Sequence, residues 1–396
     1  MARAAPLLLV VALLIAAPAA GAATLQQRLA RDLREAGPAS GAHALDLTSG
    51  RVLFTKRPNT RRVMMSNTKL FTTGAALEAF GPRKRFATEA FGAIGPDGVL
   101  AGDLYLRGGG DPTFDDAAAA DLVARLRAAG LTRVTGGVVG DGSRFDSELG
   151  PPGWQLNDSP PGPVGALQFN RGVLGEGFAA DPAAFAAGGL RAALIAARIP
   201  VDGNATTGRT PAGAARIATV ESPPLSVLVR LINKPSDNLF AETLAKSLGR
   251  KTSGRGTRKA GVAAALRFAR KLGVRVQIKT GSGAFPFARA TPKQLVKALV
   301  ALRKREIFPV LYDSLPISGR DGTLADRMRN GPARGRCHAK TGSHFSRVQA
   351  EQASVLSGYC RTRRGHVVVF SVMMNQVTSV PAARALQDHM VEAIVR

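Results

Sequence analysis

The sequence places a serine and a lysine three positions apart in the stretch Ser66-Asn67-Thr68-Lys69. The pattern of residues 64–82 predicts a helix that begins near Ser66 and ends at Gly81. Residues at i and i+3 of a helix share one face, about 5–6 Å apart at Cβ. An unprotonated lysine amine there can remove the serine proton and create a nucleophile. Such a pair arises about once by chance in a chain of this length, so it needs further support.

A second polar group, Ser236-Asp237-Asn238, precedes an expected helix over residues 238–249. Serine, aspartate and asparagine are also the residues preferred at helix N-caps, which gives a purely structural explanation. In the functional interpretation, Ser236 relays a proton between a lysine and the leaving group. Asn238 then hydrogen-bonds an amide of the substrate.

The triplet Lys-Thr-Gly occurs twice, at residues 279–281 and 340–342, followed each time by serine. The later copy lies on the first of three expected strands, where a strand edge can bind an extended peptide. Gly342 would let that peptide approach closely. The earlier copy leads into a loop rich in glycine and proline, without a following pair of apolar strands. We therefore assign the later copy to the site and interpret the earlier one as an ordinary turn.

Ser-x-x-Lys, Ser-Asp-Asn and Lys-Thr-Gly together are the motif set of class A β-lactamases and penicillin-binding proteins. The chain resembles the D-alanyl-D-alanine carboxypeptidase/endopeptidase family, the class C low-molecular-mass penicillin-binding proteins. The resemblance departs from the family at Thr280-Gly281-Ser282-Gly283, where similar members have Asp-Gly-Ser-Gly, and the insert after the first motif is shorter than in larger members. The matching stretches are SNTKLFTTGAALEAFGP, GDLYLRGGGDPTF, SPPLSVLVRLINKPSDNLFAETL, SGRDGTLADRM and AKTGSHFS with LSGY.

The resemblance implies a serine-type D-Ala-D-Ala carboxypeptidase that acts on peptidoglycan stem peptides, with endopeptidase activity as an addition. It implies that β-lactams inhibit the enzyme covalently and that no cofactor takes part. Ser66 would be the nucleophile and Lys69 the base. Ser236 would relay protons, and Asn238 would bind the substrate.

The same resemblance assigns roles to the later Lys-Thr-Gly stretch. Lys340 would supply positive potential, and Thr341 with Ser343 would bind the terminal carboxylate of the substrate. The backbone N–H groups of Ser66 and Ser343 would form the oxyanion hole. Lys69 must be neutral to act, and we expect burial and the neighbouring Lys340 to lower its pKa.

The two cysteines lie at the ends of adjacent expected strands. Cys337 precedes Lys340 on the first strand, and Cys360 ends the second. If these strands pair in antiparallel orientation, the two ends meet, which predicts a Cys337–Cys360 disulfide. Two buried free thiols are the alternative.

Three other functions remain open. A class A β-lactamase needs a second base for rapid deacylation, and between the second and third motifs only Glu242 and Glu306 are available, neither in the expected context. Glu242 lies on the same expected helix as Asn238, too close to reach across a cleft. A histidine-based hydrolase would use His338 or His344, but no Gly-x-Ser-x-Gly elbow is present, and we interpret both as incidental surface residues. A catalytically inactive envelope-binding protein is the third.

Composition places the protein outside several classes. The net charge is +26, but the basic residues are scattered without interleaved aromatics, so we expect no nucleic-acid partner. The charge suits anionic envelope polymers, or it reflects solubility and an arginine-rich composition. Five histidines without ligand spacing argue against a metal site. Residues 1–22 have a basic start, a short apolar run and small residues, which predicts a signal peptide and a periplasmic or extracellular protein without a stable membrane span.

The expected elements predict an α+β fold of the β-lactamase/transpeptidase type. A hairpin over 42–58 and three strands over 336–344, 353–360 and 366–375 can share one antiparallel sheet covered by helices. Between them lie a helical lobe and a mostly β inserted domain built around one helix. We expect a catalytic domain formed by residues 23–88 and 218–396, with residues 89–217 as the insert. Further helices are expected over residues 25–37, 116–130, 224–232, 259–273, 291–305 and 381–396.

Overall fold

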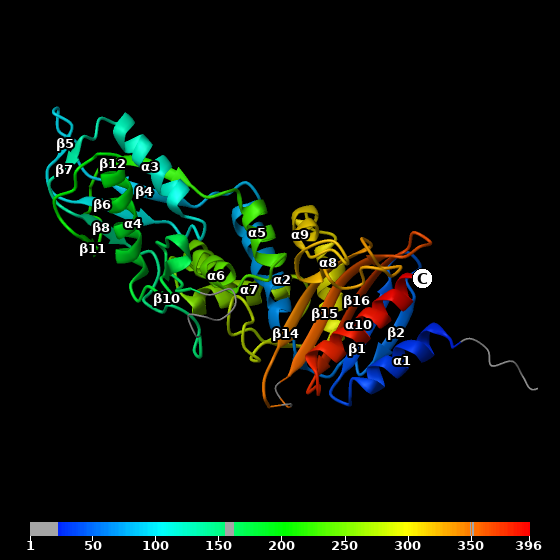
Figure 1. The fold of residues 1–396 in the computed structure, drawn as a ribbon. Helices are drawn as coiled ribbons and strands as arrows, with labels where there is room; N and C mark the ends of the chain where they lie inside the picture. Colours follow the sequence, from blue (N-terminus) through cyan, green and yellow to red (C-terminus); the bar gives the residue numbers. More distant parts are fainter. Residues whose placement is uncertain (1–22, 155–161, 349, 351) are drawn as a thin grey trace, which may run out of the picture.

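A computed structural model describes residues 23–154, 162–348, 350 and 352–396. Residues 1–22, where we expect a signal peptide, lie outside the described residues. The ribbon shows a sheet flanked by helices at one end, a group of helices in the middle and a second sheet at the other end (Figure 1).

A five-stranded antiparallel sheet brings the N-terminal and C-terminal segments together. Its strands follow the order β14, β15, β16, β1, β2, so β14 lies at one edge. Strand β1 pairs with β16, with Ala42 opposite Val372. The prediction that the hairpin and the three C-terminal strands share one sheet is confirmed. The strands are β1 (Gly41–Asp46), β2 (Val52–Lys56), β14 (Cys337–His344), β15 (Ala353–Arg361) and β16 (Val367–Asn375).

Helices cover both faces of this sheet because successive side chains of a strand point to opposite faces. Val355 of β15 is buried in the core shared with α8 (Pro292–Leu302) and the helical group. Its neighbour Leu356 is buried in a separate core with α1 (Leu25–Glu35) and α10 (Val380–Val395). Strands β15 and β16 are buried on both sides, which explains their almost continuous apolar sequences.

The middle of the molecule is a group of helices (Figure 1). Helix α6 is longer than predicted, because it continues through Gly249 and ends before Gly254, which has φ +72°. A Cβ on Gly249 would lie 2.7 Å from the nitrogen of Gly261, so glycine here allows α6 and α7 to pack closely. Helix α9 was not predicted. The elements are η1 (Met65–Thr68), α2 (Lys69–Phe80), α5 (Leu225–Asn233), α6 (Asn238–Ser253), α7 (Arg258–Lys271), α9 (Phe308–Ser314) and η3 (Gly322–Leu324).

A second five-stranded sheet has the order β11, β8, β6, β4, β12 and contains both parallel and antiparallel pairs. It packs against two helices, α3 (Asp116–Ala128) and α4 (Pro182–Ala196), in one core. Only α3 was predicted, so the expectation of a single helix in this region was wrong. The sheet contains β4 (Ala87–Phe91), β6 (Leu104–Gly108), β8 (Val138–Asp141), β11 (Ala205–Thr207) and β12 (Arg216–Glu221). Shorter elements are β3 (Arg62–Val63), β5 (Val99–Leu100), β7 (Arg133–Val134), η2 (Asn170–Gly172), β9 (Val173–Leu174), β10 (Gly177–Phe178) and β13 (Arg289–Ala290).

The longest helices of the described chain, α6 and α10, have 16 residues each. None of the helices within the described ranges combines the length and the apolar content needed to cross a bilayer.

Candidate active site

Ser66 and Lys69 meet at the junction of η1 and α2. Ser66 lies in the 3₁₀ turn, and Lys69 is the first residue of the α-helix. The Lys69 Nζ lies 3.1 Å from the Ser66 Oγ. The spacing predicted from the sequence thus places a hydroxyl and an amine within hydrogen-bonding distance.

The Lys69 side chain is completely buried, and its Nζ has two further oxygen neighbours. It lies 2.7 Å from Asn238 Oδ1 and 2.9 Å from the carbonyl oxygen of Ser282. A neutral amine has two protons and one lone pair. Donation to Asn238 and Ser282 uses both protons and leaves the lone pair for the Ser66 hydroxyl. The three neighbours therefore suit a base that faces a nucleophile.

Electrostatics favour the neutral form of this amine near physiological pH. Burial lowers the pKa of Lys69 to about 7, although the carboxylates of Asp237 and Glu242 oppose the shift. Burial thus lowers the pKa of Lys69 as expected, whereas the expected contribution of Lys340 is not among the causes of this shift. The repulsion between the lysines appears at Lys340, whose pKa is lowered well below its ordinary value by burial and by the Lys69 cation.

The pKa of Lys69 predicts how activity depends on pH. Below pH 7 the amine is protonated and cannot accept the Ser66 proton, so kcat/KM for acylation should fall. Above pH 7 the amine is neutral, so the rate should rise through a midpoint of about 7 and then level. Rate constants for acylation by a fluorescent penicillin, measured from pH 5.5 to 9, test this prediction. A midpoint close to the ordinary lysine value would contradict it.

The Ser236-Asp237-Asn238 stretch lies opposite, at the start of α6. Asp237 caps this helix by accepting from the N–H of Phe240, and Asn238 is its first residue. The N-cap function expected for this sequence is therefore present alongside the contact with Lys69. Ser236 has φ +64°, in the left-handed region that is costly for a residue with a side chain. This conformation accompanies a contact of 2.9 Å between Ser236 Oγ and Lys340 Nζ.

Lys340 lies on the edge strand β14 and is completely buried. Its carbonyl accepts from the side-chain amide of Asn67 at 3.3 Å, which ties the strand to η1. The later Lys-Thr-Gly copy thus faces both other motifs. With Lys69 contacting Ser66 and Asn238, the three motifs form one connected cluster.

Gly342 has close neighbours within the protein itself. A Cβ at this position would lie 2.9 Å from the Cβ of Met65 and 3.1 Å from the nitrogen of Ser66. Glycine therefore allows β14 to pack against the turn that carries the nucleophile, and close approach of a substrate at Gly342 stays a prediction.

Thr341 and Ser343 have side-chain partners that the motifs did not reveal. The Thr341 hydroxyl lies 2.7 Å from that of Thr323, which belongs to η3. Ser343 Oγ accepts from the guanidinium of Arg384 at 3.0 Å. Arg384 lies on α10, about forty residues later in the chain, and it brings a positive charge to the exposed end of β14.

The earlier Lys-Thr-Gly copy is not an ordinary turn, and this interpretation was wrong. Its Gly281 carbonyl accepts from the hydroxyl of Thr72 on α2 at 2.7 Å, and the next carbonyl, of Ser282, accepts from Lys69. Gly283 has φ +71°, and a Cβ on it would lie 2.2 Å from the Met65 carbonyl. The turn packs against the helix of the nucleophile and forms one side of the lysine site.

The disulfide expected from the sequence is present between Cys337 and Cys360. The two cysteines lie directly opposite each other in the β14–β15 ladder. The bond therefore joins the edge strand to its neighbour three residues before Lys340.

The interpretation of His338 as an incidental surface residue was wrong. Its ring stacks on Tyr312 with a centroid separation of 3.9 Å, and its Nδ1 lies 3.1 Å from the Tyr312 carbonyl. Burial also lowers the pKa of His338. These contacts give His338 a packing role between α9 and β14.

Known proteins resemble this chain over nearly all of its length. The D-alanyl-D-alanine carboxypeptidase of Actinomadura sp. (strain R39) is 30% identical, over 89% of this chain and 80% of that protein. Penicillin binding protein 4 of Haemophilus influenzae has a similar fold, with a TM-score of 0.80, 22% identity and coverage of 92% of this chain and 97% of that one. A penicillin G-acylated predatory endopeptidase of Bdellovibrio bacteriovorus, in complex with an immunity protein, has a TM-score of 0.58, 18% identity and coverage of 90% and 91%.

The family comparison covers the same cluster of motifs. Residues 22–175 and 165–396 match the model of the D-Ala-D-Ala carboxypeptidase 3 (S13) family. These two matches include Ser66 and Lys69 in the first range and the other two motifs in the second. The chain therefore belongs to the D-Ala-D-Ala carboxypeptidase 3 (S13) family, which is a family of serine peptidases.

Proposed function

We propose that the protein is a penicillin-binding D-alanyl-D-alanine carboxypeptidase that acts on peptidoglycan stem peptides through an acyl-enzyme on Ser66. The observation that carries the proposal is the buried Lys69 amine, which lies between Ser66 Oγ, Asn238 Oδ1 and the Ser282 carbonyl. This arrangement supplies a nucleophile and its base, and the burial of Lys69 keeps water away from the amine.

The first half-reaction forms the acyl-enzyme. Ser66 Oγ attacks the carbonyl carbon of the penultimate D-Ala while its proton passes to Lys69. The bond from that carbon to the nitrogen of the terminal D-Ala breaks, and the proton held by Lys69 passes through Ser236, which contacts Lys340, to the leaving nitrogen. This transfer returns Lys69 to its neutral form. The N–H groups of Ser66 and Ser343 stabilise the negative oxygen that forms on the way.

The second half-reaction restores the enzyme. Water attacks the acyl carbon, Lys69 takes a proton from the water, and Ser66 leaves with a proton. The products are free Ser66 and a stem peptide shortened by one residue. The same chemistry on an amide that cross-links two stems would be endopeptidase activity, and a structural neighbour is a peptidoglycan endopeptidase.

Recognition of a free carboxylate distinguishes a carboxypeptidase. Thr341 and Ser343 offer hydroxyl groups at the end of β14, and Arg384 and Lys340 add positive charge beside them. Asn238 is proposed to bind an amide of the substrate in addition to Lys69. These side chains suit a terminal D-Ala better than an internal amide.

The alternatives receive less support from the site. Glu242, one of two candidates for the second base of a β-lactamase, is buried and accepts from three donors in the turn at 281–282. A carboxylate held in this way is poorly placed to activate water, so we expect a long-lived penicilloyl adduct. The inactive envelope-binding alternative gives no reason for the strained backbone at Ser236 or the burial of two lysines.

The cellular setting extends the proposal. We propose that the protein is exported to the periplasm or extracellular envelope and that its charge of +26 favours anionic envelope polymers. We further propose that residues 89–217 form an inserted domain within a catalytic domain of residues 23–88 and 218–396. The second sheet, whose strands lie between residues 87 and 221, supports a separate inserted unit and extends a few residues beyond these bounds at each end.

The experiment is a pair of assays on the purified mature protein. We expect release of D-alanine from a peptide that ends in D-Ala-D-Ala and a stable adduct with a fluorescent penicillin after denaturing electrophoresis. Cleavage of a cross-linked dimer of stem peptides, assayed in parallel, measures the endopeptidase activity relative to the carboxypeptidase activity. Rapid turnover of the penicillin would support the β-lactamase alternative, and neither label nor D-alanine would support the binding protein.

A further inference from the structure

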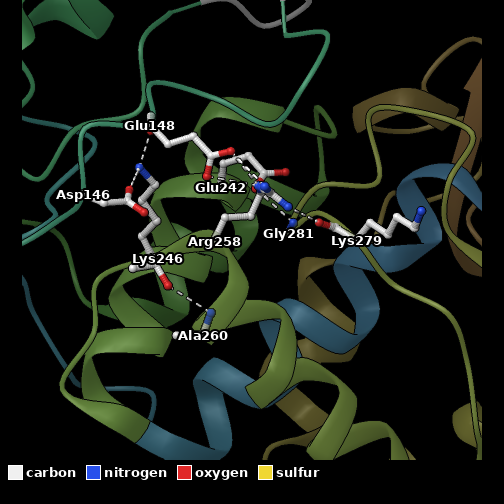
Figure 2. Close-up of polar contacts among 9 residues, drawn as sticks. Asp146, Glu148, Glu242, Lys246, Arg258, Ala260, Lys279 and Gly281 are labelled. Carbon is white, nitrogen blue, oxygen red and sulfur yellow. Dashed lines mark hydrogen bonds and ion pairs between the residues drawn. The ribbon is translucent and has the colours of Figure 1, made fainter.

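Glu242 is a buried carboxylate that the proposed mechanism does not use. It lies on α6, one turn after Asn238, with 2% of its surface exposed. Its oxygens accept from the N–H of Gly281 at 3.0 Å, the N–H of Ser282 at 2.7 Å and the hydroxyl of Ser282 at 2.6 Å. Figure 2 shows this carboxylate beside Gly281.

The same two residues of the turn face Lys69 and its helix through their carbonyl groups. Gly281 accepts from Thr72, and Ser282 accepts from Lys69. Two adjacent residues thus direct their N–H groups to Glu242 and their carbonyls to α2. The Gly281–Ser282 peptide carries both the carbonyl that accepts from Thr72 and an N–H that donates to Glu242, so its rotation would break contacts on both sides. The Ser282 carbonyl that accepts from Lys69 belongs to the next peptide, so the carboxylate and the Lys69 amine are coupled through the turn.

A second anchor holds the start of this turn. The guanidinium of Arg258 donates to the Lys279 carbonyl at 2.9 Å and pairs with Glu148 at 2.9 Å. Both Arg258 and Glu148 are partly exposed, and Figure 2 shows Arg258 between Glu148 and the turn. Gly281 leaves no room for displacement, because a Cβ on it would lie 2.5 Å from the Cβ of Ala245.

We propose that Glu242 is a positioning residue that fixes the Thr280–Gly283 turn, so that the Ser282 carbonyl orients the Lys69 amine toward Ser66. The inference rests on the proposed function, because it concerns the base of that reaction. The Ser282 carbonyl orients the Lys69 amine, and the Glu242 carboxylate holds the turn that carries this carbonyl. A carboxylate accepts three short hydrogen bonds here, and a neutral side chain would accept fewer.

The charges around Lys69 make the proposal measurable. Asp237 and Glu242 both raise the pKa of Lys69 against the effect of burial. Loss of the Glu242 charge should therefore lower the pKa of Lys69 further. The acid limb of the acylation profile should then move to lower pH, even as misalignment slows the reaction.

Other charged groups lie near Glu242 and stay in place in the test. On α6, Lys246 pairs with Asp146, and on α7, Arg258 pairs with Glu148 (Figure 2). Lys279 precedes the turn, and its Nζ lies over the ring of Phe287. None of these groups changes in the substitutions below, so a displaced midpoint reports the Glu242 charge.

The test compares Glu242→Gln with Ser282→Ala and the control Glu78→Gln in the full-length mature protein. Glu78 is a glutamate on α2 that pairs with Lys271 and Arg305 away from the site, so its loss should leave the reaction unchanged. The readout is the second-order rate constant of acylation by a fluorescent penicillin from pH 5.5 to 9. The final extent of labelling gives the active fraction, and Tm reports folding.

We expect Glu242→Gln to reduce the rate constant per labelled site by roughly 10- to 100-fold. Its midpoint should move to lower pH by about one unit. Ser282→Ala retains the carbonyl and the Glu242 charge, so it should slow the reaction less and leave the midpoint unchanged.

A Glu242→Gln midpoint equal to that of the wild type would overturn the inference, whatever happens to the rate, because a purely structural role lowers the active fraction and Tm without moving the midpoint. In that outcome the fluorescent penicillin still labels the wild-type protein, so the proposed function is unaffected. Absence of label on the wild type would instead overturn the proposed function and this inference together.

Discussion

Replacement of Ser66 by alanine is expected to abolish both D-alanine release and covalent labelling by penicillin. The change removes the only atom that forms the acyl bond in the proposed reaction and leaves Lys69 in place. Loss of the nucleophile in a serine hydrolase lowers kcat by roughly 10⁴- to 10⁶-fold. The measurements are D-alanine release under single-turnover conditions and fluorescence of the protein band after denaturing electrophoresis.

The matched control is Ser226→Ala, a serine on α5 outside the site. Both variants should keep the Tm of the wild type within a few degrees, because Ser66 contributes only a small side chain at a partly exposed position. Labelling of the Ser66→Ala protein at the wild-type rate would refute the assignment of the nucleophile. The fold and the family would be unaffected by that result.

Replacement of Lys69 by methionine is expected to reduce acylation by roughly 10²- to 10⁴-fold, the usual contribution of a general base. Methionine fills a similar buried volume but has no nitrogen that can accept the Ser66 proton. It also leaves Asn238 Oδ1 and the Ser282 carbonyl without their contact. The rate constant of penicillin acylation and the burst of D-alanine release measure the loss.

The control for this change is Lys271→Met, which replaces an exposed lysine of α7 that pairs with Glu78. The remaining activity of the Lys69→Met protein should lose the midpoint near pH 7, because the group that titrates there is absent. Residual activity that keeps this midpoint would assign the titration to another group and contradict the role of Lys69.

Much of the fold could be predicted because its signals are local. The hairpin at 42–58 and the three C-terminal strands carry apolar runs separated by turn residues, and their pairing in one sheet follows from simple packing. Helix α4 was missed because its alanine-rich sequence, PAAFAAGGLRAALIA, has two glycines and a weak pattern. We predicted that α6 ends at Gly249, because the sequence does not distinguish a glycine that allows two helices to pack closely from a glycine that ends a helix.

The candidate site was predictable to the extent that its chemistry lies in short motifs. Ser66 and Lys69 are brought together by helical spacing, and Lys340 by its position on an edge strand. The contacts of Glu242, Ser282 and Arg384 depend on chain segments that meet only in the folded protein. A signal for the turn was present in the repeated Lys-Thr-Gly, whose earlier copy we interpreted as an ordinary turn.

The role of Gly342 shows a further limit. A glycine beside a catalytic strand suggests room for a ligand, and the sequence has no feature that tells a ligand from the protein's own backbone. At Gly342 a Cβ would lie close to Met65 and the nitrogen of Ser66. Close packing against a distant segment is therefore a general reason for a glycine in a motif, and only coordinates identify the segment.

The bond between Cys337 and Cys360 has a consequence for catalysis. Strand β14 lies at the edge of the sheet and has one full ladder, with β15, and a single bridge from His338 to Ile317 on its other side. A slip by one residue would turn Lys340 away from Ser236 and present Ala339 or Thr341 instead, because side chains alternate between faces. The covalent link at the start of the ladder opposes that misalignment, so the oxidation state of two residues outside the chemistry helps to keep Lys340 directed at Ser236.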